Sequence, residues 1–210
     1  MHNPAPSSQT PGLLWLLAAI VVLALCVSGY APYDRGTWVL EVLPVLIVLP
    51  LLAWTRHSYR LTTMLYVLIT AHALVLILGG AYTYARVPLG DWVQQTFELS
   101  RNPYDKLGHF MQGFVPALAA REILLRGRYV HGRRMLAFLC VCIAMAISAV
   151  YELIEWWTAL GFGDGAVDFL GTQGDPWDTQ EDMLFALIGS STAMLTLARW
   201  HDRQLAALHR

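Results

Sequence analysis

The chain has 210 residues, of which 56% are apolar and only 14% are charged, against about 45–50% and about 25% in ordinary soluble domains. This composition indicates a membrane protein and argues against a typical soluble enzyme domain. The formal net charge of −1 gives no reason to expect a nucleic-acid partner. The three cysteines, Cys26, Cys140 and Cys142, lie inside apolar runs. We therefore interpret them as small buried hydrophobic side chains and not as a disulfide framework or a zinc site.

Six apolar runs predict membrane-spanning helices, because the hydrocarbon core is about 30 Å thick and a helix needs about 20 apolar residues to cross it. We predict an all-α transmembrane bundle that forms one domain over residues 1–210, with helices at 12–30, 37–54, 62–84, 106–125, 134–157 and 182–200. The fourth run is the weakest, because four polar residues interrupt it: His109, Gln112, Arg121 and Glu122. The first run has no Lys or Arg before it and no small-residue cleavage site after it, so we expect it to be retained.

The charges in the connections predict an orientation, because Lys and Arg favour short cytoplasmic loops. The 2–3 connection, the 4–5 connection and the C-terminal tail are basic, through Arg56, Arg60, Arg121, Arg126, Arg128, Arg133, Arg134, Arg199, Arg203 and Arg210. The 5–6 connection has no basic residue and six acids: Asp164, Asp168, Asp175, Asp178, Glu181 and Asp182. We therefore expect both termini in the cytoplasm and the acidic connection outside. The five arginines of the 4–5 connection are interpreted as topology signals and lipid-headgroup contacts.

A polar stripe lies along the fourth predicted helix. Asp105, His109, Gln112 and Pro116 follow one another at spacings of four, three and four, which places them on one helix face. A charged group facing lipid costs about 3 kcal/mol even on lenient scales, so this face is expected to meet protein or water. Asp105, in the first turn, is equally consistent with a helix cap.

Two further acidic pairs lie at helix ends that the predicted topology places on the same side of the bundle as Asp105 and His109. Glu152 and Glu155 end the apolar fifth helix one turn apart, and they repel unless they share a proton, a cation or an arginine. Asp178 and Asp182 lie at the start of the sixth helix, where helix capping is also a sound interpretation. We expect the outer ends of the fourth, fifth and sixth helices to form one polar cluster.

This cluster is compatible with two chemistries, which the sequence leaves open. Carboxylates and an imidazole can bind a divalent metal of undetermined identity, and the candidate ligands are Asp105, His109, Glu155, Asp178 and Asp182. An imidazole beside a carboxylate also suits general acid–base catalysis, for which the candidates are His109, Glu152 and Glu155.

The remaining polar residues have simpler interpretations. His72, near the middle of the third helix, is expected to form an interhelical hydrogen bond, and Glu41 to pair with Lys106 or to reach the interface. Asp164 and Asp168 are interpreted as solvated loop residues. Aromatic residues gather at the predicted outer ends, where a lipid or sugar headgroup would be a suitable ligand: Trp38, Tyr82, Tyr84, Trp92, Tyr104, Trp156, Trp157 and Trp177.

Three segments carry a resemblance to a known family. The stretches "YDKLGHFMQGFVPALAAREILLR" at 104–126, "YELIEWW" at 151–157 and "GDPWDTQEDMLFALIGS" at 174–190 resemble the YjdF-type family of bacterial inner-membrane proteins. The shorter Asp105-Lys106-x-x-His109-Phe110 pattern is more distantly similar to VanZ-like membrane proteins. The resemblance implies a multi-pass protein of the bacterial cytoplasmic membrane and supplies no reaction.

Three functions remain open. The first is an outward-facing hydrolase or transferase that acts on a lipid or headgroup substrate, with a metal or a proton-transfer site in the cluster. The second is an ion-coupled transporter, for which Pro44, Pro50 and Pro116 could break helices near a path. The third is a non-catalytic scaffold. No G-x-S-x-G, P-loop, dinucleotide fingerprint, C-x-x-C or H-E-x-x-H motif occurs, which argues against the corresponding soluble enzyme classes.

Overall fold

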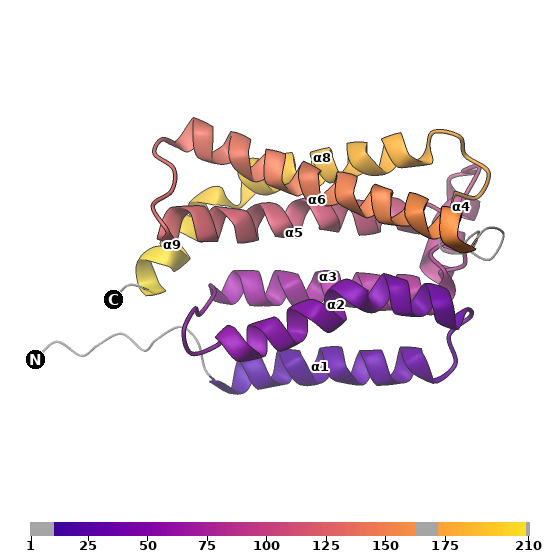
Figure 1. Cartoon of the computed structure of the whole chain (residues 1–210), viewed down its shortest axis with the longest axis horizontal. Helices are drawn as coiled ribbons and strands as arrows, with labels where there is room; N and C mark the ends of the chain where they lie inside the picture. Colours follow the sequence, from indigo (N-terminus) through magenta and orange to yellow (C-terminus); the bar gives the residue numbers. More distant parts are fainter. Residues whose placement is uncertain (1–10, 163–171, 209–210) are drawn as a thin grey trace, which may run out of the picture.

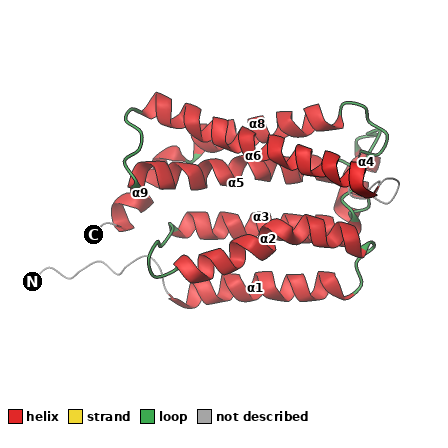
Figure 2. Ribbon diagram, viewed as in Figure 1, coloured by secondary structure: helices red, strands yellow, loops and turns green. Residues whose placement is uncertain are grey.

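The computed structural model describes residues 11–162 and 172–208, and every regular element in these ranges is a helix (Figure 2). Asp164, Asp168 and Arg210 lie outside the described residues. The helices are α1 (Pro11–Tyr30), α2 (Arg35–Thr55), α3 (Thr63–Tyr82), α4 (Pro88–Thr96), α5 (Tyr104–Arg126), α6 (Arg133–Phe162), α8 (Asp178–Thr196) and α9 (Ala198–Leu208). The predicted all-helical fold is confirmed.

The long helices lie side by side in two layers (Figure 1). One layer contains α1, α2 and α3, and the other contains α5, α6 and α8, while packing of α3 against α5 joins them. The tightest association is between α5 and α8. We call one end of the bundle the acidic end, where α4 lies, α5 and α8 begin and α6 ends; α9 and the α2–α3 and α5–α6 loops lie at the opposite, basic end (Figure 1).

Four helices are long and apolar enough to cross a membrane by themselves: α1, α2, α3 and α6. The consecutive helices α8 and α9, bent by 62° relative to each other, qualify together as a fifth candidate. α5 does not qualify, because polar residues in its interior, among them His109, Gln112, Arg121 and Glu122, lower its hydropathy. The chain is therefore a multi-pass membrane protein with four or five candidate spans by length and composition among the described residues.

The arrangement explains how α5 accommodates its polar residues. Most of its inner positions are buried, including Gly108, His109, Gln112, Arg121 and Glu122, because α3, α6 and α8 all pack against it. The outer helices behave in the opposite way: α1 exposes Trp15, Leu23 and Val27, as expected for a helix that faces lipid.

Local sequence sets the start of α2. Asp34 is the N-cap residue, and its Oδ1 accepts a hydrogen bond of 2.7 Å from the backbone N–H of Thr37. This hydrogen bond lowers the pKa of the Asp34 carboxyl.

Pro44 and Pro50 lie inside α2, and Pro116 lies inside α5. The expectation that these prolines break helices is wrong, since both helices continue past them.

The sequence did not predict two short helices. α4 has only 9 residues and lies across the acidic end (Figure 1). α9 replaces the end of the predicted sixth helix, because the chain bends beyond Leu197. Both are amphipathic and too short to span a bilayer, so a search for long apolar runs misses them.

Candidate functional site

Two glycines bring α5 and α8 into close contact. A Cβ at Gly113 would collide with the backbone carbonyl of Ala186, and one at Gly189 would collide with the carbonyl of Phe110. Small residues at a membrane helix crossing allow the backbones to approach each other. Because Asp182 lies one turn before Ala186, and His109 one turn before Gly113, this crossing sets their two side chains side by side.

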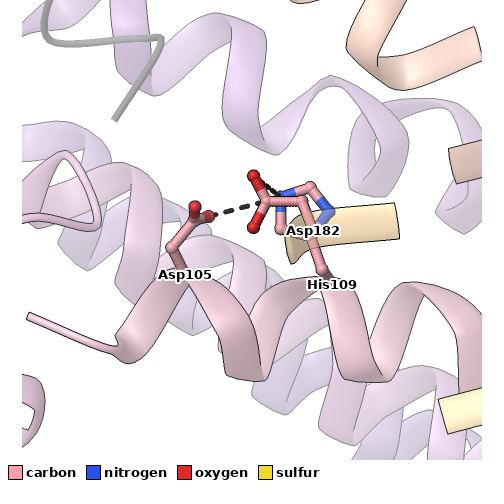
Figure 3. Close-up of side chains that lie close together, drawn as sticks. All are labelled: Asp105, His109 and Asp182. Atoms are coloured by element: carbon pink, nitrogen blue, oxygen red, sulfur yellow. Dashed lines mark ion pairs between the residues drawn. The ribbon is translucent and has the colours of Figure 1, made fainter. Parts of the chain in front are cut away.

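The imidazole of His109 lies at the centre of the site (Figure 3). Its Nε2 is 3.4 Å from Asp105 Oδ1, on the preceding turn of α5, and 3.7 Å from Asp182 Oδ2 on α8. His109 and Asp182 are buried, and the side chain of Asp105 is only 13% exposed. The polar stripe of α5 therefore faces protein, as predicted, and Asp105 points at His109 instead of capping its helix.

Gln112 fixes the orientation of the imidazole. His109 Nδ1 lies 3.1 Å from Gln112 Oε1, a carbonyl oxygen that accepts a hydrogen bond in the tautomer whose proton is on Nδ1. In that tautomer the lone pair of Nε2 faces Asp105 and Asp182. Metal-ligating histidines have this same arrangement, in which the second ring nitrogen donates to a carbonyl or carboxylate.

α6 supplies two more carboxylates beside the ring. Glu152 Oε1 is 3.8 Å from His109 Nδ1, and both Glu152 and Glu155 are buried. Two groups of potential ligand atoms lie within 4.8 Å of one another: Asp105, His109 and Asp182 form one, and His109, Glu152 and Glu155 the other. The predicted meeting of the three helix ends thus brings four of the other five candidate residues around His109.

Three carboxylate oxygens of this cluster are buried with no hydrogen-bond partner within the described residues: both oxygens of Asp182 and Oε1 of Glu152. An unpaired buried polar group costs about 1–3 kcal/mol, and more when charged. Proteins rarely keep such groups without a function or a ligand. The unpaired oxygens distinguish this cluster from an ordinary interhelical contact.

Asp178, the sixth candidate, has a different partner. Its Oδ1 forms an ion pair with Arg101 Nη1, and it is absent from both potential ligand groups among the described residues. It does not cap α8 through its side chain either; instead Asp175 Oδ1 accepts a 2.9 Å hydrogen bond from the N–H of Trp177.

Arg101, which sequence analysis overlooked, covers the site at the acidic end. Its Nη2 lies 3.1 Å from Glu181 and 3.4 Å from Asp175. Burial by itself would lower the pKa of Arg101, but the hydrogen bonds and charges of its acidic partners, Asp178 first, together outweigh burial and raise that pKa. The available signal was the presence of Arg86 and Arg101 in a connection expected to face the acidic side.

The expectation for Glu41 is wrong on both alternatives. Its Oε2 accepts a 3.0 Å hydrogen bond from the Tyr151 hydroxyl, and Glu41 is 4% exposed. Lys106 pairs with Glu181 at 2.6 Å instead. Glu41 therefore connects α2 to α6 from inside the bundle, and it does not reach the interface.

A second buried network lies at the basic end. Glu122 Oε2 is 3.0 Å from His201 Nε2 on α9, and its two oxygens accept hydrogen bonds from the N–H of Thr62. Arg126 Nη1 donates to Glu122 Oε1 at 3.0 Å, and Arg121 Nη2 pairs with Asp202 at 2.6 Å. Two of the five arginines expected to contact lipid headgroups, Arg121 and Arg126, thus have partners within the protein instead.

His72 occupies an unexpected setting. Its Nε2 is buried with no hydrogen-bond partner in the part of the chain that the structure describes, so the predicted interhelical bond is not made by this nitrogen. His72 lines a cavity between the two layers, together with Gln112 and Tyr151. Tyr84 and Tyr104, predicted at the outer interface, are buried instead.

The fold and this polar cluster define a class: a multi-pass membrane protein with a buried His/carboxylate site near one end of its bundle. The chain belongs to the family described as "Predicted membrane protein (DUF2238)", which matches residues 13–203. It is 59% identical over 195 residues to "Inner membrane protein YjdF" of Escherichia coli (strain K12), covering 93% of each chain. The resemblance drawn from the sequence is confirmed. No solved structure matches the chain.

Proposed function

We propose that the chain is a metal-dependent enzyme of the bacterial inner membrane, which hydrolyses or transfers a lipid headgroup at the acidic end of the bundle. The observation that carries the proposal is the convergence of Asp105, His109 and Asp182, with both Asp182 oxygens buried and unpaired. A divalent cation would neutralise the two carboxylates and occupy the Nε2 lone pair, which Gln112 directs toward them. Carboxylate and imidazole ligands together suit Mn²⁺, Fe²⁺ or Zn²⁺.

The chemistry assigned to each side of the imidazole differs. A metal held by Asp105, His109 and Asp182 would supply a Lewis acid and an activated water. Glu152, whose Oε1 lies 3.8 Å from Nδ1, and Glu155, which is grouped with it, would accept and return a proton.

The topology that this function requires has six spans, with α5 as the additional one. Support comes from the course of α5 alongside the other long helices (Figure 1) and from the burial of its polar face. The basic end would face the cytoplasm, with both termini, and the acidic end would face outward. Arg101 and Lys106 are basic residues on the outward side, but each is paired with acids there.

A cysteine-accessibility experiment tests this topology. In a background without Cys26, Cys140 and Cys142, a cysteine at Gln95 on α4 should react with a membrane-impermeant maleimide in intact cells. A cysteine at His131, in the α5–α6 loop, should react only after permeabilisation. The reverse pattern, or labelling of both in intact cells, would rule out the proposed orientation.

The enzyme proposal is tested with inner-membrane lipid extract, purified protein and added divalent metal, with products followed by mass spectrometry. We expect new headgroup products that His109→Asn and Glu155→Gln abolish, while His131→Asn, at an exposed histidine of the opposite end, retains them. Size-exclusion profiles and unfolding temperatures establish that the variants are folded. Turnover that persists in His109→Asn would show that the cluster around His109 does not catalyse the reaction.

Ion-coupled transport is the second candidate, and one observation favours it. Polar groups continue inward from the cluster, since Gln112 contacts His109 and lines the cavity that also contains His72. Transport would require proton or cation flux. Proteoliposomes that carry a pH-sensitive dye should show flux dependent on His72 and His109 if this candidate holds, and no flux if the enzyme proposal holds.

A further inference from the structure

A cavity of about 560 Å³ lies between the two helix layers. This volume falls within the range of about 300–1,000 Å³ that is typical of small-ligand pockets. Its walls come from α1, α2, α3, α5 and α6, and they are mostly aliphatic, for example Leu17, Val45, Leu49, Ile69 and Val115. The aliphatic part of such a cavity does not hold ordered water, so inside a membrane its natural occupant is a hydrocarbon chain.

The end of the cavity near the α2–α3 loop is positively charged. Arg56, His57 and Arg60 line it, and all three are exposed. The Arg56 guanidinium lies 5.8 Å from the ring of Trp15, another lining residue. No carboxylate lines the cavity among the described residues. The charge at this mouth is therefore uncompensated from within the cavity and complementary to a phosphate.

The length of the cavity corresponds to one leaflet. Along α2 the lining residues run from Pro44 to Arg56, twelve positions that span about 18 Å at about 1.5 Å per residue. Half of a hydrocarbon core about 30 Å thick is about 15 Å. An acyl chain whose headgroup lies at the level of Arg56 and Arg60 would thus end near the middle of the bundle.

The inner end of the cavity does not provide a second headgroup site. Gln112 and Tyr151 line it, but Gln112 is already bonded to His109 and the Tyr151 hydroxyl to Glu41. Among the described residues that line this end, His72 alone has a buried nitrogen without a hydrogen-bond partner, and one water molecule can satisfy it. The charged group of an amphiphile therefore belongs at the basic mouth.

We infer that this cavity binds one anionic bilayer phospholipid from the leaflet at the basic end, with its phosphate at Arg56, His57 and Arg60 and an acyl chain between the helix layers. This lipid site lies at the opposite end of the bundle from the His109 cluster. It requires neither a metal nor turnover, so it goes beyond the proposed function and can fail independently of it.

The experiment uses the full-length protein, purified in mild detergent and exchanged into nanodiscs of equal phosphatidylglycerol and phosphatidylethanolamine. Native mass spectrometry then counts the lipids that stay bound to the protein after it is released from the nanodiscs. Ala18→Phe fills the cavity from α1, and its control is Ala19→Phe, an exposed neighbour that does not line the cavity. The double variant Arg56→Gln/Arg60→Gln removes the charged mouth, and Arg133→Gln/Arg134→Gln is its control, with the same charge change at the same end.

The parent protein and both controls should retain about one phosphatidylglycerol per chain. Ala18→Phe should lose it, and the double variant at Arg56 and Arg60 should lower the preference for phosphatidylglycerol over phosphatidylethanolamine by at least about tenfold. If Ala18→Phe does not fold, the arginine variants decide. Retention of no lipid by the parent, or equal retention of the two lipids in all proteins, would overturn the inference, as would equal loss in a variant and its control.

Discussion

Replacement of Asp182 by Asn separates a ligand site from a structural ion pair. Asp182 is 1% exposed, both of its oxygens lack a hydrogen-bond partner among the described residues, and its Oδ2 is 3.7 Å from His109 Nε2, beyond hydrogen-bond range. In metal-free protein the carboxylate therefore accepts no hydrogen bond from the described residues. An Asn amide at this position could donate to Asp105 or to the Nε2 lone pair.

The expected sign follows from these contacts. Relief of one unsatisfied buried group is worth about 1–3 kcal/mol, so Asp182→Asn should stabilise the metal-free protein. For a chain of this size that is about 2–4 °C in unfolding temperature per kcal/mol. A metal at a hundred times its dissociation constant stabilises a protein by about 2.7 kcal/mol. This second gain should occur in the parent and be absent from the variant.

The assay is thermal unfolding in one detergent at a fixed scan rate, first with a chelator and then with added Mn²⁺ or Zn²⁺. If Asp182 served only to hold a protonated His109, its removal would instead destabilise the chelated protein by about 3–5 kcal/mol, as loss of one partner from a buried pair does. A lower unfolding temperature for Asp182→Asn in chelator would refute the reasoning.

Three further predictions concern the structure around the site, and each is measured by unfolding in detergent. Gly113→Ala should cost about 1–3 kcal/mol because its Cβ meets the Ala186 carbonyl, whereas Gly161→Ala, with open space around it, should not destabilise; equal effects would show that the α5–α8 contact tolerates separation. Glu122→Gln should lower the free energy of unfolding by about 3 kcal/mol, since Glu122 bonds to Thr62, Arg126 and His201. The control Glu98→Gln, at an exposed site, should change it by no more than about 0.5 kcal/mol. A Glu122→Gln protein as stable as the control would contradict this. Asp34→Ala should cost about 1 kcal/mol at neutral pH, and Asp34→Asn much less. Because the pKa of Asp34 is lowered in the folded protein, the ionised cap stabilises the protein above the ordinary Asp pKa of about 3.9, and this contribution is lost as the pH falls through the lower folded pKa. A loss of stability in Asp34→Ala that does not depend on pH would exclude an ionised cap.

Helical periodicity and topology were enough to predict most of the site. Asp105 and His109 are four residues apart on one helix, so their proximity follows from geometry alone. Glu152, Glu155 and Asp182 join them because helices that alternate in direction bring the end of one and the start of the next to the same side. These relations depend on spacing and count of spans, both of which are visible in the sequence.

The remaining features depend on tertiary contacts that spacing does not reveal. Asp178 lies one turn from Asp182, yet Arg101 from a distant loop takes it as a partner. Glu41 reaches Tyr151 only because α2 packs where it does. The partners of Arg121 and Arg126 were not predicted, because Asp202 is distant in the sequence and Glu122 lies on the same helix. α9 was not predicted because it is too short and too polar for a search based on hydropathy.

X-ray absorption of the metal-loaded protein tests the central claim most directly, because it reports the ligands of the bound ion. The account predicts one metal per chain, with a nitrogen ligand at about 2.0–2.1 Å for Zn²⁺ that disappears in His109→Asn and persists in His131→Asn. A protein that binds no stoichiometric metal, or whose metal has the same ligands in His109→Asn, would contradict a metal centre at Asp105, His109 and Asp182.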